Sequence, residues 1–125
     1  MIKLGKSSRA KLATCCFEIQ DIVNYAADNG DIDFAVICGH RGEKEQEAAF
    51  KNGASKAHFG QSGHNQLPSI AVDIIPYPID WNDLERFKKL AAWILKCSEK
   101  LGIKLYWGGN WDKFPDMPHY SINNK

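Results

Sequence analysis

Hydrophobic residues recur at helical spacing in three parts of the chain, which predicts three amphipathic helices. The first covers residues 8–29, and a shorter one covers residues 43–51. The third begins at Asn82, a good N-cap residue with Glu85 in the capping-box position, and ends at Gly102. The N-terminal segment is therefore expected to be one long helix.

Short apolar runs between these helices predict buried strands at residues 34–38, 70–75, 104–107 and 119–122. By contrast, residues 54–69 are polar, contain Gly60, Gly63 and Pro68, and show no period. A loop of this length inside a small domain is usually functional or disordered. The pattern as a whole predicts an α+β fold, with a single domain over residues 1–125.

Composition removes several classes of function. A chain of 125 residues with 44% hydrophobic and 25% charged residues can bury one core. The 16 basic and 15 acidic residues nearly cancel, which argues against nucleic acid as the main partner because duplex binding needs a clustered basic face. No apolar run approaches the ~18 residues that span a membrane, and no apolar stretch follows the basic N-terminus. We therefore expect synthesis in a cytoplasm without a signal peptide, and no membrane insertion.

The cysteines do not have the spacing of a metal site or of a small disulfide-linked domain. They are Cys15, Cys16, Cys38 and Cys97, and no two of them form a C-x-x-C pair. We expect reduced thiols that pack as small hydrophobic side chains and take no part in the chemistry.

Asp73 is the most informative single residue, because it interrupts the otherwise apolar strand at residues 70–75. An ionised carboxylate there is costly unless it is paired, hydrogen-bonded or bound to a metal. Taken alone, Asp73 could be a buried carboxylate satisfied by backbone groups or by an arginine. Two histidines add a second interpretation, since His64 lies upstream in the polar loop and His119 begins the last strand.

His64, Asp73 and His119 together form a ligand set of the kind that catalytic zinc uses, with the fourth position left for water. A structural zinc site would instead have four protein ligands, usually including thiolates. Bound zinc would lower the pKa of that water to about 7, and a nearby carboxylate would pass its proton to the leaving amine. Asp116, three residues before His119, is the first candidate for this carboxylate, and Asp112 is the competing one.

A series of short motifs in a fixed order adds a family to this interpretation. They are Cys38-Gly39-His40-Arg41, Gln46, Gly53-Ala54-Ser55-Lys56, Ser62-Gly63-His64, Ala71-Val72-Asp73-Ile74, Trp107-Gly108-Gly109 and Asp116-Met117-Pro118-His119. In this order they resemble the peptidase M15 family, and within it the phage endolysins that act as L-alanyl-D-glutamate peptidases. The resemblance covers about residues 34–122, with the catalytic motifs at 38–122 and the helical segment 8–29 outside it.

The resemblance implies a role for each matching residue. His64, Asp73 and His119 correspond to the zinc ligands. Asp116 corresponds to the catalytic acid/base, and Arg41 to the arginine that polarises the scissile carbonyl and stabilises the oxyanion, a role suited to a fixed guanidinium.

Substrate contacts are expected from residues beside these motifs. Ser62 stands just before the first ligand, as either a substrate contact or a support for the ligand. His40 precedes Arg41 and could contact substrate or be structural. Trp107 flanks the Gly-Gly turn and could bind substrate or form a wall of the cleft.

The implied fold is the compact α+β arrangement of the Hedgehog/DD-peptidase type, with the site on one face of a small antiparallel sheet. The implied function is that of a monomeric endolysin that hydrolyses the L-Ala–D-Glu bond of peptidoglycan stem peptides, with Zn2+ as cofactor, after release from the host cytoplasm to the cell wall. A D-alanyl-D-alanine carboxypeptidase and a non-catalytic, zinc-stabilised wall-binding module are the alternatives. Two departures from the wider family favour the endopeptidase: His64 and Asp73 are nine positions apart rather than seven, and the base is Asp116 rather than glutamate.

Overall fold

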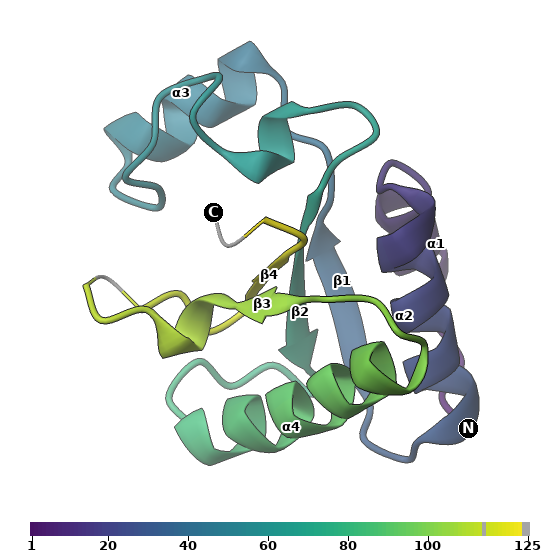
Figure 1. The fold of residues 1–125 in the computed structure, drawn as a ribbon. Coiled ribbons are helices and arrows are strands. Elements are labelled where there is room, and N and C mark those ends of the chain that lie inside the picture. Colours follow the sequence, from purple (N-terminus) through teal and green to yellow (C-terminus); the bar gives the residue numbers. More distant parts are fainter. Residues whose placement is uncertain (114, 124–125) are drawn as a thin grey trace.

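The strands of the computed structural model form one antiparallel sheet, within the described residues 1–113 and 115–123 (Figure 1). They are β1 (Phe34–Cys38), β2 (Ala71–Pro76), β3 (Tyr106–Trp107) and β4 (His119–Ser121), in the order β1-β2-β4-β3. All neighbouring pairs are antiparallel. The predicted α+β class is therefore confirmed, and β3 is shorter than the predicted strand at 104–107.

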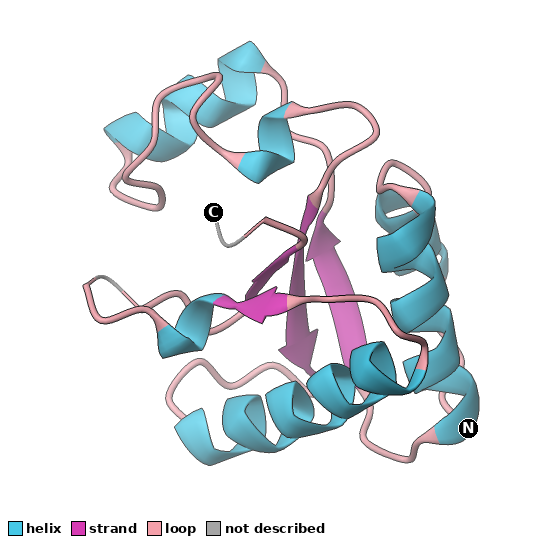
Figure 2. Ribbon diagram, in the orientation of Figure 1, coloured by secondary structure: helices cyan, strands magenta, loops and turns pink. Residues whose placement is uncertain are grey.

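Helices cover one face of this sheet and leave the other to loops (Figure 2). The elements are α1 (Lys6–Leu12), α2 (Phe17–Asn29), α3 (Glu43–Lys51) and α4 (Leu84–Lys100), with short 3-10 turns η1 (Gly63–Asn65) and η2 (Gly108–Asn110). α1, α2 and α4 supply the hydrophobic core with the sheet, whereas α3 lies at the opposite end of the molecule from α4 (Figure 1).

Strand alternation decides which side chains face the core. Val72 and Ile74 of β2 belong to the hydrophobic core, as does Tyr120 of β4. Because successive side chains on a strand point to opposite faces, Asp73 and His119 lie on the face away from α2 and α4. The fold thus separates a buried, helix-covered face from a face that carries the polar side chains of Asp73 and His119.

The N-terminal segment is two helices, so the prediction of one helix over 8–29 is wrong. Between α1 and α2 the backbone leaves the helix and bonds to the loop before β2. The Ser69 N–H donates to the Thr14 carbonyl, and the Cys16 N–H donates to the Ser69 carbonyl, both at 2.8 Å. These long-range hydrogen bonds replace helical ones, while Leu12 and Cys15 still face the core and preserve the helical spacing.

The N-cap of α4 is Asp83 rather than the predicted Asn82. The Asp83 side chain accepts a hydrogen bond from the Arg86 backbone N–H at 3.4 Å. Asn82 lies one residue too early, and its own N–H donates to the Asp80 carboxylate at 3.0 Å. The capping box with Glu85 is therefore absent from this described helix start, although the helix itself is where the pattern predicts it.

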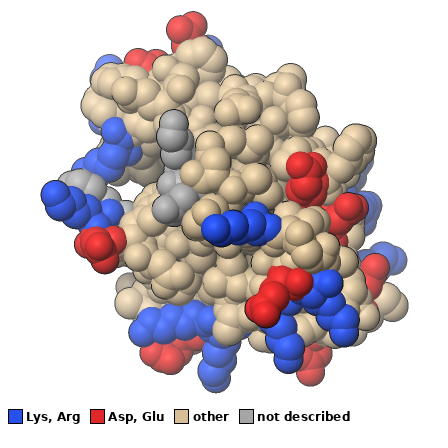
Figure 3. All heavy atoms as spheres, viewed as in Figure 1, with Lys and Arg blue, Asp and Glu red and all other residues tan. Residues whose placement is uncertain are grey.

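Charged side chains of both signs are interspersed on the face of α4 shown in Figure 3. Within α4, Lys88 and Glu85 form an ion pair at 3.4 Å. Among the helices of the described residues, none is long and apolar enough to cross a lipid bilayer.

Candidate active site

Asp73 is the centre of a row of residues that crosses three strands. On β2 it pairs with His119 of β4 on one side and with Cys38 of β1 on the other. The register of β1 shifts between Val36 and Cys38, and such an irregularity redirects side chains at a strand end. Side chains opposite each other in antiparallel strands are neighbours, so sheet pairing brings Asp73 next to His119.

His64 reaches this row from the loop between α3 and β2. It lies in η1, where the Ser62 hydroxyl accepts a hydrogen bond from the His64 backbone N–H at 3.2 Å. The ring Nδ1 donates to the Gly39 carbonyl at 2.7 Å, and Nε2 faces Asp73. A proton held on Nδ1 leaves the Nε2 lone pair available for a metal, as histidine ligands require.

The two distances from Asp73 to the predicted histidine ligands match the spacing of metal ligands. His64 Nε2 lies 3.1 Å from Asp73 Oδ1, and His119 Nδ1 lies 3.5 Å from the same oxygen. Tetrahedral zinc with bonds of about 2.0–2.1 Å holds its ligand atoms roughly 3.3 Å apart. Two groups of described residues could each hold a metal ion, and they share Asp73: one is Cys38, His64 and Asp73, and the other is Asp73, Asp116 and His119. Imidazole nitrogens and carboxylate oxygens at these distances from Asp73 suit a metal ion bound beside it.

The charges of Asp73 and His64 are stabilised by each other. Burial alone would raise the pKa of Asp73, but hydrogen bonds from His119 and His64 hold that pKa well below its usual range. Burial alone would lower the pKa of His64, but hydrogen bonds to Asp73 and Cys38 raise it to about 10. In the metal-free protein at neutral pH, a protonated His64 therefore pairs with an ionised Asp73. A bound metal ion would replace that proton.

Asp116 lies beside His119 because the chain makes a close turn at Gly108. The Asp116 backbone N–H donates to the Gly108 carbonyl at 2.9 Å, and a Cβ added to Gly108 would lie 2.6 Å from the Asp116 carbonyl oxygen. The Asp116 carboxylate is 4.0 Å from His119 Nδ1, with 43% of its side chain exposed. Partial burial and then the charge of Asp73 raise the pKa of Asp116. Such a carboxyl group is suited to accept and return a proton.

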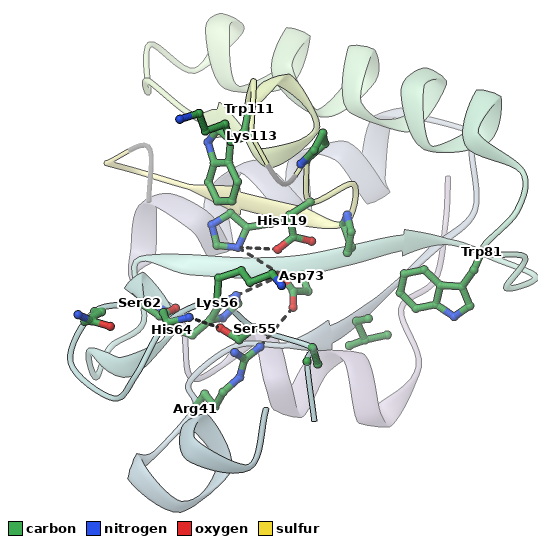
Figure 4. Close-up of a pocket in the computed structure, with 18 residues that line it drawn as sticks. Arg41, Ser55, Lys56, Ser62, His64, Asp73, Trp81, Trp111, Lys113 and His119 are labelled. Carbon is green, nitrogen blue, oxygen red and sulfur yellow. Dashed lines mark hydrogen bonds and ion pairs between the residues drawn. The ribbon is translucent and has the colours of Figure 1, made fainter. Parts of the chain in front are cut away.

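Arg41 approaches Asp73 from the end of β1. Its backbone N–H donates to the His64 carbonyl at 2.6 Å, which fastens the end of β1 to η1. The guanidinium Nη1 donates to Gln46 Oε1 at 3.0 Å, and Nη2 lies 3.7 Å from Asp73 Oδ2. Figure 4 shows Arg41, His64 and His119 directed toward Asp73 from different sides.

These groups open into a cavity of about 700 Å³. The predicted ligands and the candidates Arg41, Asp116 and Ser62 all contribute to its lining. Trp81 and Trp111 add aromatic surface, and two basic side chains, Lys56 and Lys113, also lie along it (Figure 4). The cavity is therefore a polar site with apolar walls, as small-molecule and peptide sites commonly are.

Three residues considered from the sequence are not among the described residues that line this cavity. His40 Nδ1 contacts the Gln66 carbonyl at 2.9 Å. Trp107 Nε1 donates to the Met117 carbonyl at 2.7 Å, so this ring supports the segment before His119. Asp112 is exposed, whereas Asp116, four residues later, belongs with Asp73 and His119 to a group that could hold a metal ion.

Two residues at the site, Cys38 and Gln46, stand in the quoted motifs but received no functional role from the sequence. The Cys38 sulfur is 3.8 Å from His64 Nδ1. Burial is the largest influence on the pKa of this thiol and raises it, but the hydrogen bond and charge of His64, with the charge of Arg41, together lower the pKa below its usual value. Its place at the strand end just before Gly39-His40-Arg41 is the signal that could have found it. Gln46 matches a family motif, but its position on a charged helix gives no hint that its side chain is buried.

Three comparisons with known proteins bear on this site. A family model described as phage L-alanyl-D-glutamate peptidase matches residues 1–124. The L-alanyl-D-glutamate peptidase of Escherichia phage T5 is 32% identical over 117 residues, covering 91% of this chain and 85% of the phage protein. The peptidoglycan L-alanyl-D-glutamate endopeptidase CwlK of Bacillus subtilis (strain 168) is 29% identical over 117 residues, covering 82% of this chain and 68% of CwlK.

A solved structure shares the fold. The crystal structure of the Serratia marcescens L-Ala D-Glu endopeptidase ChiX matches with a TM-score of 0.81 at 22% identity, over 96% of this chain and 90% of ChiX. The family model also includes α1 and α2, so the predicted start of the resemblance near residue 34 is wrong. With a family-model match over nearly its whole length, the chain belongs to the phage L-alanyl-D-glutamate peptidase family.

Proposed function

We propose that this chain is a zinc-dependent endopeptidase that hydrolyses the L-Ala–D-Glu bond in the stem peptides of bacterial peptidoglycan. The observation that carries the proposal is the convergence of His64, Asp73 and His119 on a cavity that Asp116 and Arg41 also line. The names of the phage T5 and B. subtilis relatives specify the same bond, and both align over most of the chain.

Zinc suits this donor set better than other common divalent ions. Two imidazole nitrogens and a carboxylate oxygen are typical catalytic zinc ligands, whereas Mg2+ and Ca2+ prefer oxygen ligands. Cys38 also lies near His64 and Asp73, but its sulfur faces His64 Nδ1, the nitrogen that bonds to Gly39. We therefore assign His119 rather than Cys38 as the third ligand. Bound zinc would supply Lewis acidity toward the peptide carbonyl and toward a water molecule.

In this proposal Asp116 is the general acid/base that transfers a proton from the attacking water to the leaving amine. Its carboxylate takes a proton from the attacking water and gives it to the leaving amine of D-glutamate. The partly exposed position, 4.0 Å from His119 Nδ1, supports this role because the carboxylate can reach both the metal side of the cavity and the substrate.

Arg41 stabilises the negative charge that develops on the carbonyl oxygen. Its Nη1 is held by Gln46, and Nη2 is the part that reaches the cavity near Asp73. A guanidinium fixed in advance costs no reorganisation when charge develops. Ser62 orients His64 through its backbone bond and lines the cavity, whereas Trp81 and Trp111 offer the aromatic surface first expected from Trp107.

We further propose that the protein acts as a monomer on the cell wall, after release from the cytoplasm in which it is made. Its partner is the stem peptide, which enters the open cavity beside Trp111. The peptide, rather than the glycan or a nucleic acid, is the group that must reach the zinc ligands.

A digest of purified peptidoglycan tests the function. The zinc-loaded protein should generate fragments with a new N-terminal D-Glu, detected by mass spectrometry. Release of D-alanine instead would identify a carboxypeptidase, and no cleavage would leave a wall-binding module. Elemental analysis should find one zinc per chain in the wild type and none in His64→Ala or His119→Ala. A wild type that binds no zinc after reconstitution would refute the mechanism.

A further inference from the structure

Gln46 is a fully buried polar residue on α3, with 0% of its surface exposed. Its amide makes four hydrogen bonds. Oε1 accepts from Arg41 Nη1 at 3.0 Å and from Asn65 Nδ2 at 3.1 Å. Nε2 donates to the Ser55 hydroxyl at 3.0 Å and to the Ala57 carbonyl at 2.7 Å. These bonds use the whole capacity of an amide side chain, so Gln46 has none left for a substrate.

The partners of Gln46 all belong to the parts of the chain that build the cavity. Arg41 follows β1, Asn65 lies in η1 beside His64, and Ser55 and Ala57 line the cavity from the loop after α3. Gln46 therefore joins three segments that are separate in sequence and meet at one side of the site.

Asn65 extends the same network around His64. Its Nδ2 also donates to the Arg41 carbonyl at 3.0 Å, while its Oδ1 accepts from the backbone N–H groups of Gly60 and Ser62 at 2.9 and 3.1 Å. Through Asn65, the Gln46 amide is linked to the turn that presents His64. Arg41 and His64 are thus held in one rigid unit rather than by independent loops.

We propose that Gln46 is a positioning residue for catalysis: it fixes Arg41 by Nη1 so that Nη2 faces the scissile carbonyl, and it locks that guanidinium to the turn carrying His64. The inference rests on the proposed function only for the identity of the carbonyl. Within the described residues, the other contacts of the Arg41 guanidinium are longer, at 3.6 Å to Cys38 Sγ and 3.7 Å to Asp73 Oδ2. Without Gln46, the long Arg41 side chain would have to be ordered at each turnover.

Two substitutions separate positioning from simple stability. Gln46→Met keeps the side-chain length but removes all four bonds, and it should lower kcat about 10- to 100-fold, change KM less than about threefold and retain zinc. Gln46→Glu keeps an acceptor for Arg41 and loses the donors to Ser55 and Ala57. It should melt at a lower temperature yet keep kcat within about threefold of wild type.

Ile94→Val serves as the control for lost stability. Ile94 is fully buried in α4, in the core behind the sheet, so this change weakens packing away from the cavity. Assayed at a temperature where every variant is folded, Ile94→Val should keep the wild-type kcat. A Gln46→Met variant that also keeps the wild-type kcat would overturn the inference.

A double variant tests whether Gln46 acts through Arg41. If it does, Arg41→Ala/Gln46→Met should be no more than about threefold slower than Arg41→Ala alone, because the two changes remove the same interaction. If the fold-losses in kcat of the two single variants instead multiply in the double variant, the inference is overturned. If Gln46→Met fails to fold, Gln46→Glu provides the test instead. A loss of about tenfold or more in the kcat of Gln46→Glu would overturn the inference.

A spectroscopic measurement does not depend on activity. In the wild type, the guanidinium N–H resonances of Arg41, assigned with Arg41→Lys, should be slow to exchange with solvent, and Gln46→Met should abolish that protection. If the wild type protects them no better than Gln46→Met does, the anchoring is wrong. A wild type that cuts no L-Ala–D-Glu bond but shows this difference would refute the proposed function and leave the anchoring of Arg41 in place.

Discussion

Replacing Gly39 by alanine is the sharpest structural test of how the N-terminal segment supports the site. An added Cβ would overlap Thr14 Oγ1 and the Lys11 carbonyl oxygen, and would lie 3.1 Å from Cys15 Sγ. The threonine side chain could rotate away, but the Lys11 carbonyl is backbone at the end of α1. Overpacking of this kind costs about 1–3 kcal/mol. For a domain of this size that corresponds to a fall in Tm of roughly 3–15 °C.

The same change should weaken zinc binding. The Gly39 carbonyl accepts the hydrogen bond from His64 Nδ1, so any shift of this strand end moves the group that orients a ligand. Loss of such a supporting contact typically lowers metal affinity about 10- to 100-fold. Differential scanning fluorimetry and a competitive chelator titration measure the two effects.

Gly42→Ala is the matched control for Gly39→Ala. A Cβ at Gly42 would meet only the flexible Glu45 side chain, at 3.5 Å or more, and the Gly42 backbone at φ −74° suits any residue. The free energy of unfolding of Gly42→Ala should stay within about 0.5 kcal/mol of the wild-type value. If Gly39→Ala is as stable as Gly42→Ala and binds zinc equally well, the close contact between α1 and the strand end has no influence on the site.

Three further predictions concern the proposed chemistry. Asp116→Asn should retain zinc and melt no lower than wild type but lose about two to four orders of magnitude in activity, while Asp112→Asn stays substantially active; the opposite result would give the base role to Asp112. Arg41→Ala should keep zinc and lose about a hundredfold or more in kcat, with only partial rescue by lysine, and near-normal turnover would make Arg41 structural. Because the pKa of His64 is raised to about 10 in the metal-free protein, zinc must displace a proton from it, and apparent zinc affinity should rise as pH increases from 6.5 toward 10. Calorimetry in buffers of different ionisation enthalpy should detect proton release on zinc binding at pH 7.5. A zinc affinity that does not change with pH would contradict the pairing of protonated His64 with ionised Asp73.

Most of the elements, and the importance of Asp73 and His119, could be predicted because their causes are local. Asp73 stands out in an apolar strand whatever the tertiary structure, and helix spacing located α3 and α4. The D-x-x-H spacing likewise brought attention to His119 and Asp116, which a single turn holds together.

Features that depend on distant contacts could not be predicted in the same way. The end of α1 is determined by hydrogen bonds to Ser69, more than fifty positions later in the chain. The hydrophobic residues keep their helical spacing across the break between α1 and α2, so the sequence pattern does not reveal it. Trp107 stands in the expected motif, but the Met117 carbonyl determines where its indole points. Gln46 is buried only because Arg41, Asn65 and the loop after α3 surround it.

The break between α1 and α2 has a consequence for building chimeric lysins. Thr14 and Cys16 bond to Ser69, and Thr14 Oγ1 accepts a hydrogen bond from the His40 N–H at 2.8 Å, so this turn contacts both the segment after β1 and the end of the loop that carries His64. A designer who trimmed the domain to its catalytic motifs, starting near residue 34, would remove that support along with two helices of core. Any wall-targeting module should therefore be joined ahead of an intact α1 rather than in exchange for it. The boundary for domain shuffling lies before this helix.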